Sequence, residues 1–262
     1  MKNIIKIAIT GAYGRMGSSL IKTIQKYKNI KLACVIVKQK KKDLFNIKEK
    51  KIKIYENIKE TINLFDILID FTNPESTLKN LKICAQYNKN IVIGTTGFKK
   101  QEYDIIKKHS KKISIVLSSN FSIGINLIFE LLKHTSKILN DSYDVEILES
   151  HHRNKIDSPS GTALSIGKII AKNKKWNFEK CSIYRKKEIT NIRKKNQIGF
   201  SIIRGGNTIG KHKIMFLGSE ENIVISHQAN SRNTFSDGAI KAAIWLKDKK
   251  QGLFNMKHVL KI

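Results

Sequence analysis

The stretch Lys6-Ile7-Ala8-Ile9-Thr10-Gly11-Ala12-Tyr13-Gly14-Arg15-Met16-Gly17 decides the fold of the first part of the chain. It reads as a short apolar strand followed by a turn with three glycines, and the helix expected next carries Leu20, Ile21 and Ile24 on one face. In a βα unit such glycines serve a tight turn, close approach of the backbone to a pyrophosphate, and packing of the helix on the strand. The stretch predicts a dinucleotide-binding unit, with an ordinary βα turn as the alternative.

Apolar strands and helical segments alternate through the first half of the chain. Helices are expected near residues 75–87 and 101–108, and strands at residues 32–37, 66–71, 90–93 and 113–117. Alternation of this kind predicts a parallel sheet, whose ligands lie outside the carboxyl ends of the strands. We expect three loops to meet at that edge: residues 72–74, 94–97 and 118–121.

The pattern changes after residue 121. Helices are expected near 126–139, 162–171 and 237–246, and strands at 143–149, 199–204, 211–216 and 222–227. Strands in succession predict an α+β domain. We therefore predict an α/β fold: a Rossmann-type doubly wound parallel sheet plus a second α+β domain with a mixed sheet. The first, dinucleotide-binding domain is expected at residues 1–122, with 232–262 packing back onto it, and the substrate-binding and oligomerisation domain at 123–231.

Composition narrows the class of protein. No apolar run reaches the roughly 20 residues needed to span a bilayer, and residues 1–6 lack the features of a secretory signal. We expect a soluble, cytoplasmic protein without a membrane partner. The three cysteines, Cys34, Cys84 and Cys181, are far apart and form no C-x-x-C pattern. This spacing argues against a disulfide framework and against a zinc site, so no metal is expected.

The formal net charge of +29 raises the question of nucleic-acid binding. Lysines are spread over almost every expected helix and loop, with a denser zone only at residues 38–53. Such a distribution favours a solvated surface over a nucleic-acid interface. We expect a small-molecule partner and no nucleic acid, and keep a basic nucleic-acid-binding protein as an alternative.

A second informative stretch is Glu149-Ser150-His151-His152-Arg153-Asn154-Lys155-Ile156-Asp157-Ser158-Pro159-Ser160-Gly161-Thr162-Ala163. It places imidazoles and a cation immediately before a helix start, whose backbone N–H groups can hold a carboxylate. The stretch predicts proton transfer at a site for small anions. The alternatives are that the histidines form a polar loop, a metal site or part of the core, that Lys155 is one more surface lysine, and that Ser160 is only an N-cap.

Cofactor preference is indicated by the end of the second strand. An acidic reader of the ribose 2′-hydroxyl is expected roughly 20 residues after the glycine loop, but that position is Val37, followed by Lys38. A lysine can meet a 2′-phosphate, so we expect NADPH to be used at least as readily as NADH. The alternative is that Lys38 belongs to the general lysine excess.

Several motifs, taken in order, resemble the 4-hydroxy-tetrahydrodipicolinate reductase (dihydrodipicolinate reductase) family of bacterial lysine biosynthesis. They are the glycine loop at 11–17 and the segments 69–75, 93–98, 120–126 and 151–163. The resemblance implies NAD(P)H-dependent reduction of 4-hydroxy-tetrahydrodipicolinate, through the dehydrated dihydrodipicolinate, to tetrahydrodipicolinate in the diaminopimelate pathway. It also implies a homotetramer and a dicarboxylate substrate.

The resemblance implies roles for individual residues. His151 would be the proton donor and Lys155 its essential basic partner, and the substrate carboxylates would meet His152, Lys155, Gly161 and Thr162. Arg15 and Lys38 would address the adenosine phosphate end. The cofactor-binding residues would be Gly11, Ala12, Tyr13, Gly14, Arg15, Met16, Lys38, Gly94, Thr95, Thr96, Ser118, Ser119, Asn120 and Phe121.

A further alternative is another NAD(P)-dependent dehydrogenase of an amino-acid pathway, such as a semialdehyde dehydrogenase. That chemistry requires a nucleophilic cysteine in a polar loop. Cys34 and Cys84 lie in apolar patterns, and Cys181 has no catalytic companion nearby in the sequence.

Overall fold

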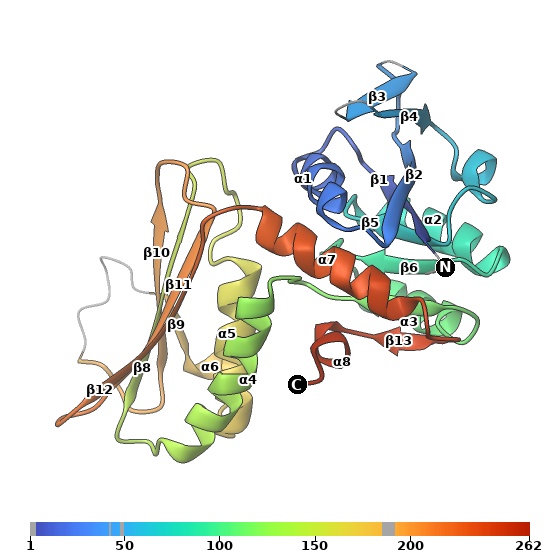
Figure 1. Cartoon of the computed structure of the whole chain (residues 1–262). Helices are drawn as coiled ribbons and strands as arrows, with labels where there is room; N and C mark the ends of the chain where they lie inside the picture. The colour runs from blue at the N-terminus through green and yellow to red at the C-terminus, as the bar shows by residue number, and fades with distance from the viewer. Residues whose placement is uncertain (1–3, 42, 48–49, 185–191) are drawn as a thin grey trace. The chain divides into compact units, whose positions relative to one another are not determined.

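The computed structural model of the protein describes residues 4–41, 43–47, 50–184 and 192–262. The first three residues and parts of the lysine-rich zone 38–53 therefore lie outside the described residues. The chain divides into two compact units: one comprises the chain up to Ile123 together with Arg232–Ile262, and the other Gly124–Ser231 (Figure 1). Among the described helices, none combines the length and apolar character of a bilayer-spanning segment.

The first unit is built on an eight-stranded sheet with the order β13-β7-β6-β5-β1-β2-β4-β3. Its neighbouring strands pair in parallel, except for the antiparallel hairpin of β3 and β4. The strands are β1 (Ile5–Thr10), β2 (Ile30–Ile36), β3 (Leu44–Ile47), β4 (Lys50–Tyr55), β5 (Ile67–Asp70), β6 (Asn90–Ile93), β7 (Ser114–Leu117) and β13 (Gly252–Phe254). The chain reverses its direction of winding at β1, and at such a switch point a doubly wound sheet binds its ligand.

Helices cover both faces of this sheet. They are α1 (Arg15–Thr23), α2 (Pro74–Gln86), α3 (Lys100–His109), α7 (Asn233–Leu246) and α8 (Met256–Leu260), with short 3-10 turns η1 (Ile24–Lys26) and η2 (Ile58–Thr61). Leu20 of α1 and Ile240 of α7 belong to one buried cluster, whereas Leu81 of α2 and Ile106 of α3 belong to another. The predicted Rossmann-type sheet is confirmed.

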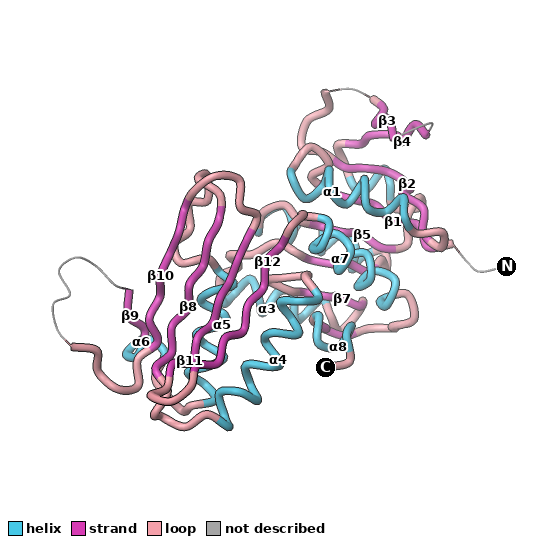
Figure 2. The backbone as a smooth tube through the Cα atoms, turned by 60° about the vertical axis from the view of Figure 1, so that its left-hand side comes forward, coloured by secondary structure: helices cyan, strands magenta, loops and turns pink. Residues whose placement is uncertain are grey.

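The second unit has a five-stranded sheet with the order β12-β11-β8-β10-β9. Its elements are α4 (Ile123–Ile138), β8 (Asp144–His151), α5 (Gly161–Asn173), α6 (Phe178–Cys181), β9 (Ser182–Tyr184), β10 (Ile198–Arg204), β11 (Gly210–Leu217) and β12 (Asn222–Ala229). Strand β10 is parallel to β8 and β9, while β11 is antiparallel to β8 and β12. The predicted mixed sheet is therefore confirmed, and α4 and α5 lie on one of its faces (Figure 2).

The sequence-based prediction missed β3, β4, β9, β13, α6 and α8. The lysine-rich zone at residues 38–53 overlaps the β3–β4 hairpin, which was not predicted. Ile52 and Ile54 alternate with lysines, and both isoleucines are buried against the first unit's core. An apolar residue at every second position is the pattern of a half-buried strand, but here the surrounding lysines made the segment look polar.

Candidate active site

The glycine loop between β1 and α1 fits a pyrophosphate. Gly11 adopts a φ of +67°, and Gly14 precedes α1 without a side-chain hydrogen bond that would cap the helix. A Cβ atom at Gly14 would lie 3.1 Å from the Gly11 carbonyl oxygen, and one at Gly17 only 2.2 Å from the same oxygen. A side chain at Gly14 would occupy the space inside the loop, and one at Gly17 would push the helix away from the loop. The glycines therefore suit an anion at the helix start.

The three loops expected to converge do follow neighbouring parallel strands. The Gly94 N–H donates to the Asp70 carbonyl oxygen (2.8 Å), and the Ser118 N–H donates to that of Ile93 (3.2 Å). These bonds continue the β5–β6–β7 ladder by one step past the strand ends. The residues Gly94 to Thr96 and Ser118 to Phe121 therefore lie at the same edge of the sheet as the glycine loop.

The side chain of Asp70 holds the loops after β5 and β6 through hydrogen bonds, a role that sequence reasoning missed. Its fully buried carboxylate accepts hydrogen bonds from Thr72 Oγ1 (2.6 Å), Thr77 Oγ1 (3.1 Å) and Asn80 Nδ2 (2.8 Å). Thr77 Oγ1 lies 2.8 Å from the hydroxyl of Thr95, one of the expected cofactor residues. A carboxylate at the end of an otherwise apolar strand was the available signal, because buried acids are almost always paired.

Tyr13 joins the glycine loop to the basic segment after β2. Its ring stacks on Phe45 of the β3–β4 hairpin, with centroids 6.3 Å apart and an interplanar angle of 26°. The Lys41 N–H donates to Tyr13 Oη at 3.2 Å. Lys38 itself is exposed. The segment expected to address the adenosine phosphate end is thus tied to the loop expected to hold the pyrophosphate.

In the second unit, strand β8 directs Glu149 and His151 to the same face. Residues along β8 alternate between buried and less buried positions, and both side chains fall in the buried set with Val145 and Ile147. Glu149 is fully buried and His151 is 8% exposed. The period of two in a strand therefore places a carboxylate and an imidazole side by side at the end of an apolar row.

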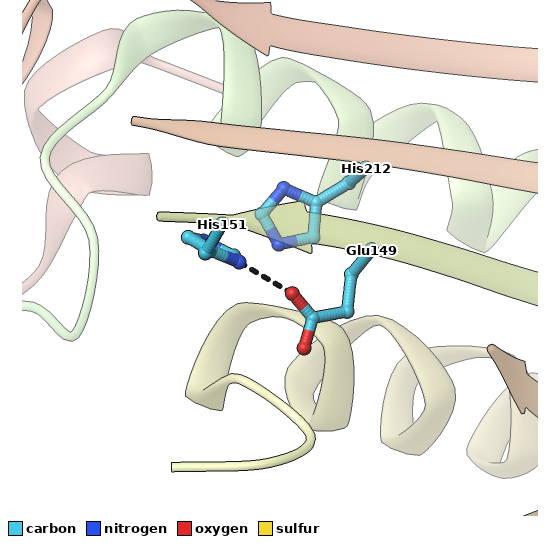
Figure 3. Close-up of side chains that lie close together, drawn as sticks. All are labelled: Glu149, His151 and His212. Atoms are coloured by element: carbon cyan, nitrogen blue, oxygen red, sulfur yellow. Dashed lines mark hydrogen bonds and ion pairs between the residues drawn. The ribbon is translucent and has the colours of Figure 1, made fainter. Parts of the chain in front are cut away.

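Strand register adds two residues from distant parts of the chain. His212 of β11 pairs directly with Glu149, and Arg204 of β10 pairs with His151. Figure 3 shows Glu149 pointing to Nδ1 of His151, with the ring of His212 beside them. The two imidazole rings meet edge to face, with centroids 5.2 Å apart. Sequence reasoning missed these roles of Glu149, Arg204 and His212.

The carboxylate of Glu149 is held ionised. Burial by itself would raise the pKa of Glu149, but hydrogen bonds from His151, Arg204 and the Ser160 N–H outweigh burial and lower the pKa to about 2. Arg204 binds both oxygens, Nη2 to Oε1 at 2.6 Å and Nη1 to Oε2 at 3.0 Å. A charge buried with this many donors is a fixed anion at physiological pH.

His212 is held neutral. Burial, followed by the nearby charge of His151, lowers the pKa of His212 to about 3. Its Nε2 lies 3.2 Å from Ser160 Oγ, and its Nδ1 is buried with no hydrogen-bond partner in the described part of the chain. The site therefore combines one imidazole facing an anion with a second that stays uncharged.

The start of α5 together with Lys155 already binds a carboxylate. Ser160 caps the helix by accepting from the Ala163 N–H (3.2 Å), as the N-cap alternative predicted, while its own N–H donates to Glu149. Lys155 Nζ donates to Asp157 Oδ1 at 2.8 Å. Burial opposes ionisation of Asp157, but hydrogen bonds from Lys155 and from the Gly161 backbone lower its pKa. Asp157 thus shows that this corner accepts a carboxylate.

A group of residues that could hold a metal lies at this site, although the sequence analysis expected no metal. Glu149, His151 and His212 each offer a ligand atom, and these atoms lie within 4.8 Å of one another. The third residue was not foreseen because it comes from a strand 61 residues after His151. The bonding of Glu149 favours a proton site over a metal site, because both of its oxygens accept from the cation of Arg204.

All three cysteines, which lie among the described residues, are buried. Burial raises the pKa of Cys34 to about 11 and also raises the pKa values of Cys84 and Cys181. A thiol with a raised pKa is a poor nucleophile at neutral pH. These environments disfavour the semialdehyde dehydrogenase alternative.

The chain matches known proteins over its whole length. The family model described as "Dihydrodipicolinate reductase, N-terminus" matches residues 5–121, and "Dihydrodipicolinate reductase, C-terminus" matches 124–260. A 4-hydroxy-tetrahydrodipicolinate reductase of Buchnera aphidicola subsp. Baizongia pistaciae is 52% identical over 100% of this chain and 99% of its own. The enzyme of that name from Buchnera aphidicola subsp. Cinara cedri is 51% identical over 100% and 98%.

Solved structures share the fold. A dipicolinate-bound dihydrodipicolinate reductase from Paenisporosarcina sp. TG-14 has a TM-score of 0.77 at 24% identity, covering 96% of this chain and 97% of its own. A probable dehydrogenase from Thermotoga maritima has a TM-score of 0.65 at 12% identity, covering 97% and 92%. With the two family models and the full-length relatives, the conclusion is that this chain belongs to the dihydrodipicolinate reductase family, whose members are oxidoreductases that use a nicotinamide cofactor.

Proposed function

We propose that the protein reduces 4-hydroxy-tetrahydrodipicolinate, through the dehydrated dihydrodipicolinate, to tetrahydrodipicolinate in the diaminopimelate pathway to lysine. The full-length relatives named for this reaction support the proposal. The observation that carries it is the pairing of His151 with the buried Glu149, beside a helix start that already accepts a carboxylate. A reaction that protonates a ring carbon of a dicarboxylate needs both a proton donor and a group that binds a carboxylate.

The proposed roles follow from what each group can do. His151 donates a proton to the ring carbon next to the one that receives the hydride. Lys155 and the Gly161 N–H exchange the internal carboxylate of Asp157 for one carboxylate of the substrate, and His152 and Thr162 contact the substrate carboxylates. The first unit binds the dinucleotide and the second binds the substrate. The reduced nicotinamide, when bound, supplies the hydride.

For the cofactor, we propose that the glycine loop Gly11 to Met16, residues Gly94 to Thr96 and residues Ser118 to Phe121 form the binding edge. Lys38 follows β2 where an acid would read a ribose 2′-hydroxyl, so NADPH is used at least as readily as NADH. A comparison of kcat/KM for the two cofactors tests this. A strong preference for NADH would refute it.

The protein is further proposed to be a cytoplasmic homotetramer. The helices α4 and α5 lie on one face of the five-stranded sheet, and Ile203 and Val224 are 48% and 47% exposed. Exposed β-branched side chains on a sheet suit a contact between copies of the chain. The proposal includes no nucleic-acid partner and no membrane partner.

The decisive assay follows the loss of NADPH absorbance with freshly generated 4-hydroxy-tetrahydrodipicolinate. We expect turnover, with inhibition by pyridine-2,6-dicarboxylate, a planar analogue of the ring. His151→Gln and Lys155→Ala are each expected to lower kcat at least about 100-fold, because proton transfer or its basic partner is lost. Lys172→Ala, an exposed lysine in α5, is the matched control and should keep normal turnover.

Near-normal turnover in both His151→Gln and Lys155→Ala would reject the assigned roles. No cofactor oxidation by the unmutated protein, with salt-sensitive retention on DNA, would favour the nucleic-acid-binding alternative.

A further inference from the structure

We propose that Glu149, clamped by Arg204, is a positioning residue that holds the Nδ1–H of His151 and so makes Nε2 the atom that transfers the proton. This inference rests on the role proposed for His151. It concerns a group that does not touch the substrate and acts through the imidazole.

The contacts of Glu149 leave its carboxylate one orientation. Oε1 accepts from Arg204 Nη2 (2.6 Å) and from the Ser160 N–H (3.0 Å), and Oε2 accepts from Arg204 Nη1 (3.0 Å). The remaining bond of Oε2 is to His151 Nδ1, drawn as the dashed line in Figure 3. A two-point clamp by a planar guanidinium fixes a carboxylate both in position and in rotation.

The anion defines the tautomer of His151. An ionised carboxylate can only accept, so the ring nitrogen that faces it must carry a hydrogen. Nδ1 is therefore protonated in both charge states of the imidazole, and the proton that can be gained or lost resides on Nε2. The form that donates is the imidazolium, and the proton that it gives up is the one on Nε2.

A glycine keeps one side chain away from Nε2. Gly210 faces this nitrogen, and a Cβ atom at that position would lie 3.1 Å from Nε2. The neighbouring His212 stays neutral, with its Nε2 engaged at Ser160. His212 thus adds no positive charge beside the imidazolium and does not compete for Glu149.

The proton balance of the step is simple. After hydride addition, the electron pair released to the neighbouring ring carbon forms a C–H bond with the proton of His151 Nε2–H. The N–H bond breaks and its electron pair stays on Nε2, so the imidazolium becomes a neutral imidazole. Glu149 remains a carboxylate throughout, and His151 recovers its proton from water.

The test compares two glutamates of the same strand, the buried Glu149 and the partly buried Glu146. Glu149→Gln keeps the shape and removes the charge, and Glu146→Gln does the same at a glutamate paired with Arg193 outside the site. We expect Glu149→Gln to lower kcat about 100-fold with little change in KM, since proton transfer and not binding is impaired. Glu146→Gln should keep both quantities within about twofold.

A double variant separates positioning from stability. Glu149→Gln leaves the Arg204 cation, 18% exposed, without its partner and can destabilise the unit. Glu149→Gln/Arg204→Met removes that cation, so stability should recover while kcat stays low. If kcat recovers together with stability, Glu149 is structural and the inference is wrong.

A direct reading of the tautomer keeps this test independent of the assay. Nitrogen-15 chemical shifts of the histidines should show His151 with its hydrogen on Nδ1 in the unmutated protein, and a mixture of tautomers in Glu149→Gln. If the unmutated chain shows this signature but no reductase activity, the proposed function fails and the positioning of His151 stands. Unchanged shifts and unchanged kcat in Glu149→Gln would overturn the inference.

Discussion

His212 is a buried imidazole that cannot be charged without cost. Its pKa is lowered to about 3, mainly by burial, whereas in an unfolded chain it would titrate near the ordinary value of 6.5. Between these values the unfolded chain binds a proton that the folded chain does not. The contribution of His212 therefore weakens the fold as the pH falls below about 6.5.

We predict that His212→Gln removes this pH dependence. Between about pH 7 and about pH 5 the free energy of unfolding of the unmutated protein should fall by about 2 kcal/mol more than that of the variant. Urea denaturation at the two pH values measures the difference. His134→Gln, at a side chain that is 73% exposed, is the control and should follow the unmutated protein. Parallel curves for the unmutated protein and His212→Gln would contradict the prediction.

At the residue scale, sequence reasoning proposed reacting groups, His151 and Lys155, but missed the side chains that surround His151. His151 and Lys155 stand in a local motif, so their chemistry could be inferred from neighbours in the chain. Glu149 lies in the same stretch, and the alternation of apolar residues before it is consistent with its buried side. Arg204 and His212 gave no local signal, because they are ordinary residues of strands that lie far along the chain.

Helix α7 illustrates how packing overrides local preference at the scale of elements. Gly238 lies within α7, where alanine is intrinsically favoured over glycine by about 1 kcal/mol. In the folded protein a Cβ atom at Gly238 would lie 1.8 Å from the carbonyl oxygen of Phe121. The helix approaches the loop after β7 too closely for any side chain.

We predict that Gly238→Ala destabilises the protein by about 2 kcal/mol or more, against the helix preference, because the helix must move away from the loop. Gly161→Ala is the matched helical control, since a Cβ atom there meets no atom within 4 Å. Thermal unfolding of the unliganded proteins measures both effects. A Gly238→Ala variant at least as stable as the unmutated protein would show that the contact yields easily.

Elements with a clear apolar pattern of their own could be predicted, and those without one could not. Strands β1, β2, β5, β6 and β7 and helices α1 to α5 were located within a few residues, because apolar runs or an apolar face mark them in the sequence, even where the strand has only four residues. Strand β13 has only three residues, and they form a strand because they pair with β7. Such a strand depends on an available sheet edge, and the local sequence does not show whether that edge exists.

At the scale of the whole molecule, the proposed homotetramer has a definite mass. One chain is 29.9 kDa, so static light scattering should give about 120 kDa, four times this value. Ile203→Lys/Val224→Lys should lower this mass, because unpaired charges would be buried in the contact. The control Lys172→Ala should leave it unchanged. A mass equal to one chain for the unmutated protein would contradict the proposal.

The amino-acid sequence by itself determined the two kinds of layered architecture, the glycine loop and the motif proposed for proton transfer, since each is encoded in residues adjacent along the chain. Tertiary structure decided which side chains surround the imidazole of His151. The apolar alternation of a strand says which of its faces is buried, but the partner strand and its register depend on how all the strands share one core. Pairing β8 with β10 and β11 in one register places Arg204 and His212 at Glu149, and a shift of one residue would turn those side chains to the opposite face.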